Sequence, residues 1–357
     1  MTAPGVSFIV PVHNGERWLE EVLISILDQR DGRPFEVIVV DDGSTDRSRD
    51  VLATWAARGA IRLLRSTSRG AAAALNLGIR KARHPIVCLV DQDVVLQPGW
   101  LGALLGEFGA PHVAAVQGYY LTDRRAPLLA RVMGLDIEQR YARIGAGPTS
   151  HVCTGNSAYR LEALHNAGLF DEGFGYGLDN DMSYRLARAG YELRFCPAAN
   201  SVHRWRETLG SYLRQQYGLG YGRLDVVARH PHQLTGDAVS PPVMMAHAPL
   251  MLGALGAGVA ALVLRGVGQP WHPAAWICAA VIAFLALERL LAGMRATIRH
   301  RDPAGLCFMP VHLLRDLAWA LAIVVWTARR LARRARHPSH SMPGSHGSAS
   351  PPSRGVY

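Results

Sequence analysis

The hydrophobic positions of the chain follow two regimes. In the N-terminal part, short apolar runs alternate with segments whose apolar residues recur at helical spacing. Strand-length runs at residues 6–12, 35–40 and 86–90 predict buried parallel strands, and periodic segments such as 16–29 predict helices. Residues 122–148 are polar and rich in arginine, which predicts an irregular surface excursion. The alternation as a whole predicts an α/β fold with a mostly parallel sheet.

From residue 238 onward the pattern changes to long uncharged stretches. Residues 238–264 and 266–287 contain no Asp, Glu, Lys or Arg. Each is long enough to cross a hydrocarbon core about 30 Å thick, so residues 238–291 predict a transmembrane helical hairpin. The turn carries only Arg265, whereas several arginines follow the second stretch. The positive-inside rule therefore places both ends of the hairpin, and the N-terminal domain, in the cytoplasm.

A third apolar segment follows, and it is shorter. Residues 317–327 lie between Asp316 and an arginine-rich stretch. Because this segment is short for a span, residues 308–337 favour an interfacial helix against an anionic membrane, with a third span as the alternative. Residues 338–357 are rich in Pro, Ser, Gly and His, and this composition predicts a disordered tail.

Composition and charge narrow the possible partners. The net charge of +10 is concentrated near the C-terminus, after the apolar stretches, which favours a membrane over nucleic acid as the partner. We therefore expect no nucleic-acid binding. The five cysteines are scattered and include no C-x-x-C pair, which fits reduced thiols rather than a zinc site. Neither G-x-G-x-x-G nor G-x-x-x-x-G-K-[ST] follows the first strand, which argues against a dinucleotide fold or a P-loop.

Carboxylates follow two of the predicted strands. Asp41 and Asp42 end the second strand, and Asp91 and Asp93 end the strand that finishes at Val90. In open α/β sheets, ligands bind beyond the carboxyl ends of the strands. The Asp-x-Asp spacing lets two carboxylates reach one cation, and such oxygen ligands suit Mg²⁺ or Mn²⁺ beside substrate phosphates. The alternative is an ordinary turn, where Asp is common.

Five motifs, in order, resemble family 2 glycosyltransferases of the GT-A fold. They are S-F-I-V-P-V-H-N at 7–14, V-V-D-D-G-S-T-D at 39–46, D-Q-D at 91–93, F-D-E at 170–172, and L-D-N-D-M-S-Y-R-L at 178–186 with A-G-Y at 189–191. The match covers about residues 5–225, inside a domain expected at residues 1–235. The resemblance implies a Rossmann-like nucleotide-sugar-binding domain. It also implies an inverting transfer from a nucleotide-diphosphate sugar with a divalent metal.

The resemblance gives several residues a role in binding the donor. Asp42 corresponds to the carboxylate that hydrogen-bonds the donor base, and Asp41 could share that role; Asp in an Asp-Gly-Ser sequence also commonly begins helices. Pro11 and His13 correspond to residues that flank the nucleotide, although a structural role for His13 is an open alternative. Arg69 lies in a loop that often approaches the nucleotide in this family.

The same resemblance implies a metal site. Asp91 corresponds to a residue that contacts the nucleotide and ribose, Asp93 to the metal ligand, and His203 to a second protein ligand. The metal would bridge the diphosphate and neutralise charge on the leaving group. For His203, a purely structural histidine in a polar segment is the alternative.

Asp179 corresponds to the catalytic base. It would take the proton from an acceptor hydroxyl as the oxygen attacks the anomeric carbon. A predicted helix begins here, and its dipole favours the ionised carboxylate, although simple capping is an alternative role. The family's usual Glu before this Asp is replaced by Leu178. Asp181 is a second candidate base, and Arg185 is expected to be its ion-pair partner.

The Gln-x-x-Arg-Trp motif of processive synthases is absent, which favours a single transfer. We therefore expect a glycosyltransferase at the inner (plasma) membrane, with its catalytic domain in the cytoplasm. Its expected acceptor is a hydroxyl of a lipid-linked or envelope glycan. Two alternatives remain. One is a polyprenyl-phosphate glycosyltransferase, whose anionic acceptor needs no base; the other is a catalytically degenerate paralogue that binds nucleotide or glycan at the membrane.

Overall fold

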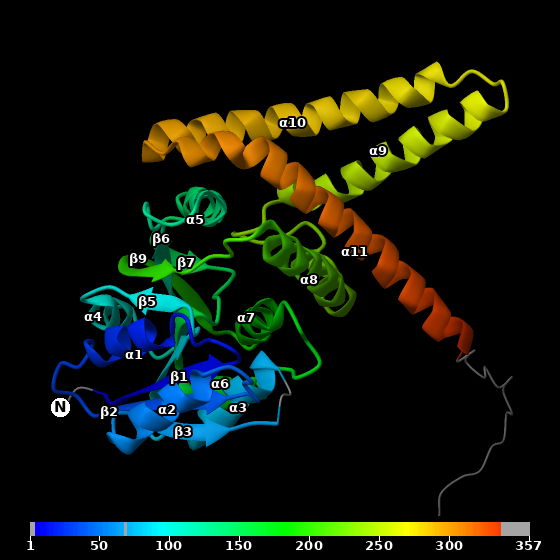
Figure 1. Ribbon diagram of the computed structural model, residues 1–357. Helices are drawn as coiled ribbons and strands as arrows, with labels where there is room; N and C mark the ends of the chain where they lie inside the picture. Colours follow the sequence, from blue (N-terminus) through cyan, green and yellow to red (C-terminus); the bar gives the residue numbers. More distant parts are fainter. Residues whose placement is uncertain (1–3, 68–69, 337–357) are drawn as a thin grey trace, which may run out of the picture.

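The computed structural model describes residues 4–67 and 70–336. A sheet-containing N-terminal part carries three long C-terminal helices, which project from one side of it (Figure 1). Arg69 and the tail at 338–357, with its predicted disorder, lie outside the described residues.

One sheet of nine strands organises the N-terminal part. Its order is β3-β2-β1-β4-β8-β6-β9-β5, and β7 pairs with β9 outside this path. The strands are β1 (Val6–Val12), β2 (Phe35–Asp41), β3 (Arg62–Arg65), β4 (Ile86–Val90), β5 (Val94–Leu96), β6 (Val113–Leu121), β7 (Gly147–Thr149), β8 (Asn156–Arg160) and β9 (Glu192–His203).

The sheet is parallel in one half and mixed in the other. β3, β2, β1 and β4 pair in parallel, as the alternating pattern predicted. β8 then runs antiparallel to both β4 and β6, and β5 and β7 run antiparallel to β9, while β6 and β9 are parallel. The expectation of a mostly parallel sheet therefore holds for the first four strands, whereas the other half of the sheet combines parallel and antiparallel pairs. Antiparallel pairing does not need the long crossover connections of a parallel pair, and only the N-terminal half has the regular strand–helix alternation that supplies them.

Helices cover both faces of the sheet. Phe8 and Val10 in β1 belong to a core with α1 and α4, whereas Ile9, pointing the other way, belongs to a core with α3 and α7. Because both faces are buried, the strands read as continuous apolar runs. The helices of this part are α1 (Leu19–Leu27), α2 (Ser48–Ala57), α3 (Ala71–Lys81), α4 (Trp100–Gly106), α5 (Leu128–Tyr141), α6 (Leu161–Asn166), α7 (Leu178–Arg188) and α8 (Leu209–Arg229).

Helix α5 corrects one expectation. Residues 122–148 contain a regular helix with Val132 and Leu135 buried, not an irregular surface excursion. These two side chains pack against Ala304 and Phe308 from the C-terminal part of the chain. The apolar face of α5 was hard to recognise because its partners lie far away in the sequence.

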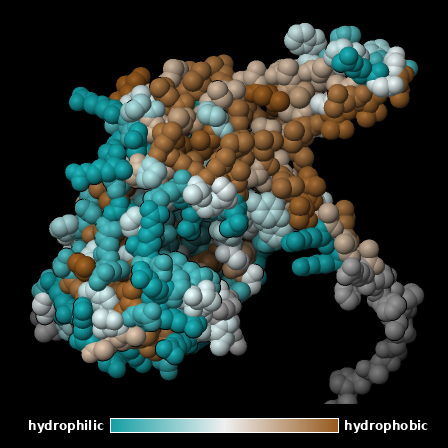
Figure 2. Space-filling model, in the orientation of Figure 1, coloured by the Kyte–Doolittle hydropathy of each residue, from teal (hydrophilic) through white to brown (hydrophobic). Residues whose placement is uncertain are grey.

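The C-terminal part contains three helices that are long and apolar enough to cross a membrane: α9 (Pro242–Gly266), α10 (His272–His300) and α11 (Phe308–Arg336). A short turn joins α9 to α10, so the two helices form a hairpin, and apolar side chains cover much of its surface (Figure 2). That this hairpin crosses a membrane stays a prediction. Helix α11 extends well beyond residues 317–327, so the shortness of that apolar segment no longer argues against a span. An interfacial position for α11 stays a prediction.

Candidate active site

The two carboxylates that end β2 have different surroundings. Asp41 is buried; its Oδ1 accepts a hydrogen bond from the Ser44 N–H at 2.9 Å, and its Oδ2 lies 3.5 Å from Arg49. These contacts hold the turn after the strand. Asp42 lies one residue further along, and its Oδ2 accepts from the Gly70 N–H at 2.8 Å, where α3 begins. The Asp42 side chain therefore contacts the start of α3, whereas the Asp41 side chain holds the turn.

The loop after β1 is tied to the turn after β4. The His13 N–H donates to Gln92 Oε1 at 2.8 Å, and Gln92 Nε2 donates to the His13 carbonyl at 3.1 Å. His13 Nδ1 also lies 2.9 Å from the Asp42 carbonyl oxygen. Half-buried Pro11 pairs in register with Val40. Sequence reasoning missed the role of Gln92, although an amide between two carboxylates could have suggested it.

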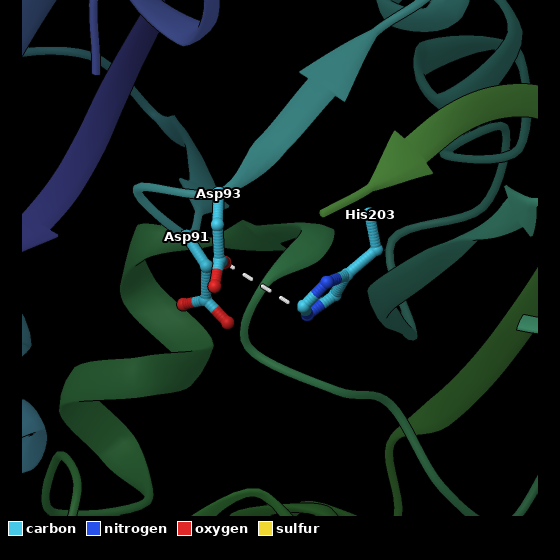
Figure 3. A group of neighbouring side chains, drawn as sticks. All are labelled: Asp91, Asp93 and His203. Atoms are coloured by element: carbon cyan, nitrogen blue, oxygen red, sulfur yellow. Dashed lines mark ion pairs between the residues drawn. The ribbon is translucent and has the colours of Figure 1, made fainter. Parts of the chain in front are cut away.

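Asp91, Asp93 and His203 meet beyond the end of β4 (Figure 3). Their candidate ligand atoms all lie within 4.8 Å of one another, and His203 Nε2 is 3.8 Å from Asp93 Oδ1. The antiparallel register of β5 on β9 creates this group, because it sets His203 opposite Val94 and so beside Asp93. Asp91 and Asp93 are far from His203 in the sequence, but this pairing brings them next to its imidazole ring.

The electrostatics of this group suit a bound cation. Burial, together with the carboxylates of Asp93 and Asp179, raises the pKa of Asp91 to about 7. Burial also lowers the pKa of His203, which favours the neutral imidazole that binds metals. The ring stacks on Trp205 at 3.8 Å, and its buried Nδ1 has no hydrogen-bond partner among the described residues. Two carboxylates and one imidazole fit Mn²⁺ or Mg²⁺ by their chemistry.

The candidate base stands in the first turn of α7. Gly177 precedes the helix in a left-handed conformation, with φ 85°, and Asp179 Oδ1 accepts from the Asn180 N–H at 2.9 Å. Its Oδ2 lies 3.8 Å from His151 Nε2, and the carboxylate is 26% exposed. Asp181 differs: it is fully buried and bound to Arg185 and His230, each at 2.8 Å. The predicted Asp181–Arg185 ion pair is confirmed, and these contacts leave Asp179 as the available base.

The comparison with known families now decides the class of this domain. Residues 7–168 match the family described as glycosyl transferase family 2. These residues form a family 2 glycosyltransferase domain. The fold agrees: a mannosyltransferase from Pyrobaculum calidifontis, solved in complex with GDP-Man and Mn²⁺, is similar with a TM-score of 0.58 and 22% identity, covering 92% of this chain and 90% of that one. The predicted GT-A fold is confirmed.

Two curated relatives show how far the similarity extends. The pre-mycofactocin glycosyltransferase of Mycobacterium tuberculosis is 31% identical over 299 residues, covering 81% of this chain and 58% of the relative. The hyaluronan synthase of Pasteurella multocida is 27% identical over 223 residues, covering 52% of this chain and 23% of the relative. This chain therefore spans little more than half the length of the first and about a quarter of the second.

Leu178 stands where the family resemblance led us to expect a glutamate before Asp179. The side chain is 7% exposed and belongs to the same apolar core as Val226 of α8. It therefore contributes packing between α7 and α8, where a glutamate would face a desolvation cost. The candidate base Asp179 lies at the start of the helix beside Leu178.

A cavity of about 490 Å³ opens beside Asp179 and His203. Its walls come from the N-terminal part and from the C-terminal helices, with α5 and α8 contributing from the former and α9 and α11 from the latter. Aromatic and aliphatic side chains make up much of the lining: Tyr120, Val132, Met133, Ile137, Tyr141, Tyr176, Trp205, Tyr212, Leu219, Leu224, Val227, Leu234, Val239, Met244, Met245, Ala248, Pro249, Trp319 and Ile323.

Proposed function

We propose that the protein is an inverting, metal-dependent glycosyltransferase whose acceptor reaches the site through the cavity beside the C-terminal helices. One observation carries the proposal: Asp179 and His203, a member of the Asp91–Asp93–His203 group, both line a cavity that α9 and α11 help to enclose. A donor site, a base and an acceptor path are thus available within one arrangement.

The donor would lie along the carboxyl edge of the parallel strands. Asp42 would accept a hydrogen bond from the base, and the loop carrying Pro11 and His13 would flank the nucleotide; the contribution of Arg69 stays a prediction. Asp93 and His203 would hold the metal, with Asp91 beside them. When bound, such a metal supplies positive charge that stabilises the departing diphosphate.

Asp179 would remove the acceptor proton. The acceptor oxygen forms a bond to the anomeric carbon from the face opposite the leaving group, the carbon–oxygen bond to the diphosphate breaks, and its electron pair leaves with the nucleoside diphosphate. The configuration inverts in this single displacement. The helix dipole at the start of α7 favours the ionised form of Asp179 before transfer, and His151 lies close enough to orient the carboxylate.

The cavity favours a hydroxyl acceptor that is lipid-linked or an envelope glycan precursor at the cytoplasmic membrane face. Pre-mycofactocin is a second candidate acceptor. The alignment with the mycobacterial relative covers 81% of this chain, so it extends past the family 2 match, which ends at residue 168. The retained carboxylate of Asp179 argues against a phosphate acceptor that needs no base, and against a degenerate paralogue.

The test is a screen of nucleotide-diphosphate sugars with the full-length protein, measuring free nucleotide released in the presence of Mn²⁺. The productive donor is then offered extracted lipid-linked glycans and, separately, pre-mycofactocin, and radiolabelled product is counted. We expect one donor to be consumed and one acceptor class to be labelled, and neither reaction to occur with Asp179→Asn. Donor binding with no turnover on any acceptor or on water would contradict the proposal and favour the degenerate paralogue.

A further inference from the structure

Two polar clusters line the cavity, and they differ in charge. The first lies around the base: Asp237 accepts hydrogen bonds from Asn180, Tyr184 and Arg223, while Asp179 stands nearby. This cluster holds one arginine for two carboxylates. The second lies between α5 and α11, and we name it the α5–α11 patch. It consists of Asp136, Arg140, His312, Arg315 and Trp319, all of which line the cavity.

The α5–α11 patch carries an excess of positive charge. Its one carboxylate, Asp136, is shared by two guanidinium groups, with Arg140 at 3.0 Å and Arg315 at 3.4 Å. Asp316, the next carboxylate on α11, lies outside the cavity lining; it is 3.5 Å from Arg315 and pairs with Arg289 at 3.3 Å. Although burial raises the pKa of Asp136, the surrounding Arg140, His312 and Arg315 lower it below its ordinary value overall. Within the cavity lining, the patch therefore presents two guanidinium groups for one ionised carboxylate.

The same patch contains donors that lack acceptors. Arg315 Nη2 and Trp319 Nε1 are buried and have no hydrogen-bond partner among the described residues. Arg140 Nη1 contacts only the sulfur of Met244, at 3.8 Å. Arg315 is 3% exposed, and its guanidinium lies over the Trp319 ring. Buried donors of this kind cost free energy unless something accepts from them, and an anion is the strongest acceptor available.

The rest of the cavity suits an apolar chain. Met244, Ala248 and Pro249 of α9 and Ile323 of α11 line it, and both helices are apolar enough to lie in a membrane. Figure 1 shows α11 crossing α9 and then running beside α8, so the cavity lies where the enzyme domain meets the membrane helices. A ligand that follows this lining has an apolar tail, an anionic group and a head near Asp179.

We propose that the α5–α11 patch is a subsite for a phosphate-type group that lies between the apolar tail and the hydroxyl-bearing head of the acceptor. Guanidinium groups bind phosphate oxygens through paired, charge-assisted hydrogen bonds. The subsite rests on the proposed function, since its ligand is the acceptor of that reaction. It narrows the acceptor class to anionic amphiphiles whose head still offers a hydroxyl to Asp179.

The test compares two probes with the same tail, farnesyl phosphate and farnesol, by calorimetry on the full-length protein in a neutral detergent. We expect farnesyl phosphate to bind at least about tenfold more tightly, the size of effect that one charge-assisted hydrogen bond supplies. Arg315→Gln should remove most of that preference and leave farnesol binding unchanged. Trp319→Phe removes the Nε1–H donor, keeps an aromatic side chain and preserves the ion pairs. It therefore tests the subsite even if Arg315→Gln does not fold.

Arg329→Gln is the matched control, because Arg329 is on the same helix but lies over Tyr221, outside the cavity lining. It should bind both probes as the wild type does. The subsite would be overturned if the wild type bound the two probes with equal affinity. It would also be overturned if Arg329→Gln and Arg315→Gln lost the same share of the preference for farnesyl phosphate. Inorganic phosphate that binds as tightly as farnesyl phosphate would overturn the amphiphile assignment.

Nucleotide release from the donor is measured on the same preparations. If nucleotide is released but farnesyl phosphate binds no more tightly than farnesol, the subsite alone is overturned. If farnesyl phosphate binds more tightly than farnesol but no nucleotide is ever released, the subsite is supported and the proposed function is contradicted.

Discussion

Replacing Asp179 by asparagine should separate the chemistry of the site from its folding. Asparagine keeps the oxygen that accepts from the Asn180 N–H at 2.9 Å, and it differs mainly in charge. Losing a charge at a helix N-terminus costs about 0.3–1 kcal/mol of folding free energy. Losing a general base costs about 10²–10⁴-fold in turnover, which corresponds to roughly 3–5 kcal/mol in the barrier. The effect on turnover should therefore far exceed the effect on folding.

Asp181→Asn is the comparison, because Asp181 is fully buried and binds Arg185 and His230. Removing its charge leaves two buried partners less well satisfied and should cost about 3 kcal/mol of stability, at the low end for a broken buried ion pair. Turnover per folded molecule should stay within a few-fold of the wild type, a difference of about 1 kcal/mol or less in the barrier.

The assay combines steady-state transfer, donor binding by calorimetry and urea unfolding in detergent for both variants. Asp179→Asn should bind the donor as the wild type does, since Asp42 and the metal group are intact. Near-normal turnover by Asp179→Asn would refute the role of Asp179 as the base and would favour an anionic phosphate acceptor instead. A larger loss of turnover per folded molecule in Asp181→Asn than in Asp179→Asn would refute the assignment of their roles.

Three further predictions concern the metal, the membrane and pH. Activity should vanish in EDTA and return with Mn²⁺ or Mg²⁺, and Asp93→Ala should be inactive but folded; full activity of that variant in EDTA would exclude the metal site. A cysteine placed at Gln269 should be labelled from outside sealed cells, and one at Arg299 should not; the reverse pattern would contradict the predicted orientation. Burial raises the pKa of Asp237, but His151 and Arg223 lower it below its ordinary value overall. Its contribution to stability should therefore be present at pH 7 and be lost as the pH falls below about 4. Urea unfolding of the wild type and Asp237→Asn at pH 7 and pH 3.5 measures this, and a difference that does not shrink at low pH would contradict it.

The sequence pattern was most informative for strands that are buried on both faces of the sheet. β1, β2 and β4 are buried on both faces, so their apolar runs identified them and the edge at which ligands bind. The pattern could not tell Asp41 from Asp42, since both follow the same run. Only the structure separates them: the Asp41 side chain accepts from Ser44 within the turn, whereas the Asp42 side chain accepts from Gly70.

Long-range pairing accounts for what local patterns missed. His203 is far from Asp93 in the sequence, and only the register of β5 on β9 brings them together; family resemblance, not spacing, pointed to it. That α11 is apolar enough over its length to span a membrane was not predicted, for a related reason. Asp316 was expected to be the polar boundary of a short apolar segment, yet Asp316 and its neighbour Arg315 are both buried, because Arg289 and Asp136 neutralise their charges from other helices.

The position of α11 bears on how acceptor preference can differ between homologous enzymes. It contributes to the cavity, packs along α8 and, through Trp326, donates a hydrogen bond to Asp225 at 2.7 Å. In the proposed function, the donor is bound at the edge of the sheet, whereas the acceptor cavity is partly enclosed by the C-terminal helices. Exchanging the C-terminal helices between homologues should therefore transplant acceptor preference while leaving the sugar unchanged. A soluble fragment that ends before α9 should still bind nucleotide but lose its discrimination among acceptors.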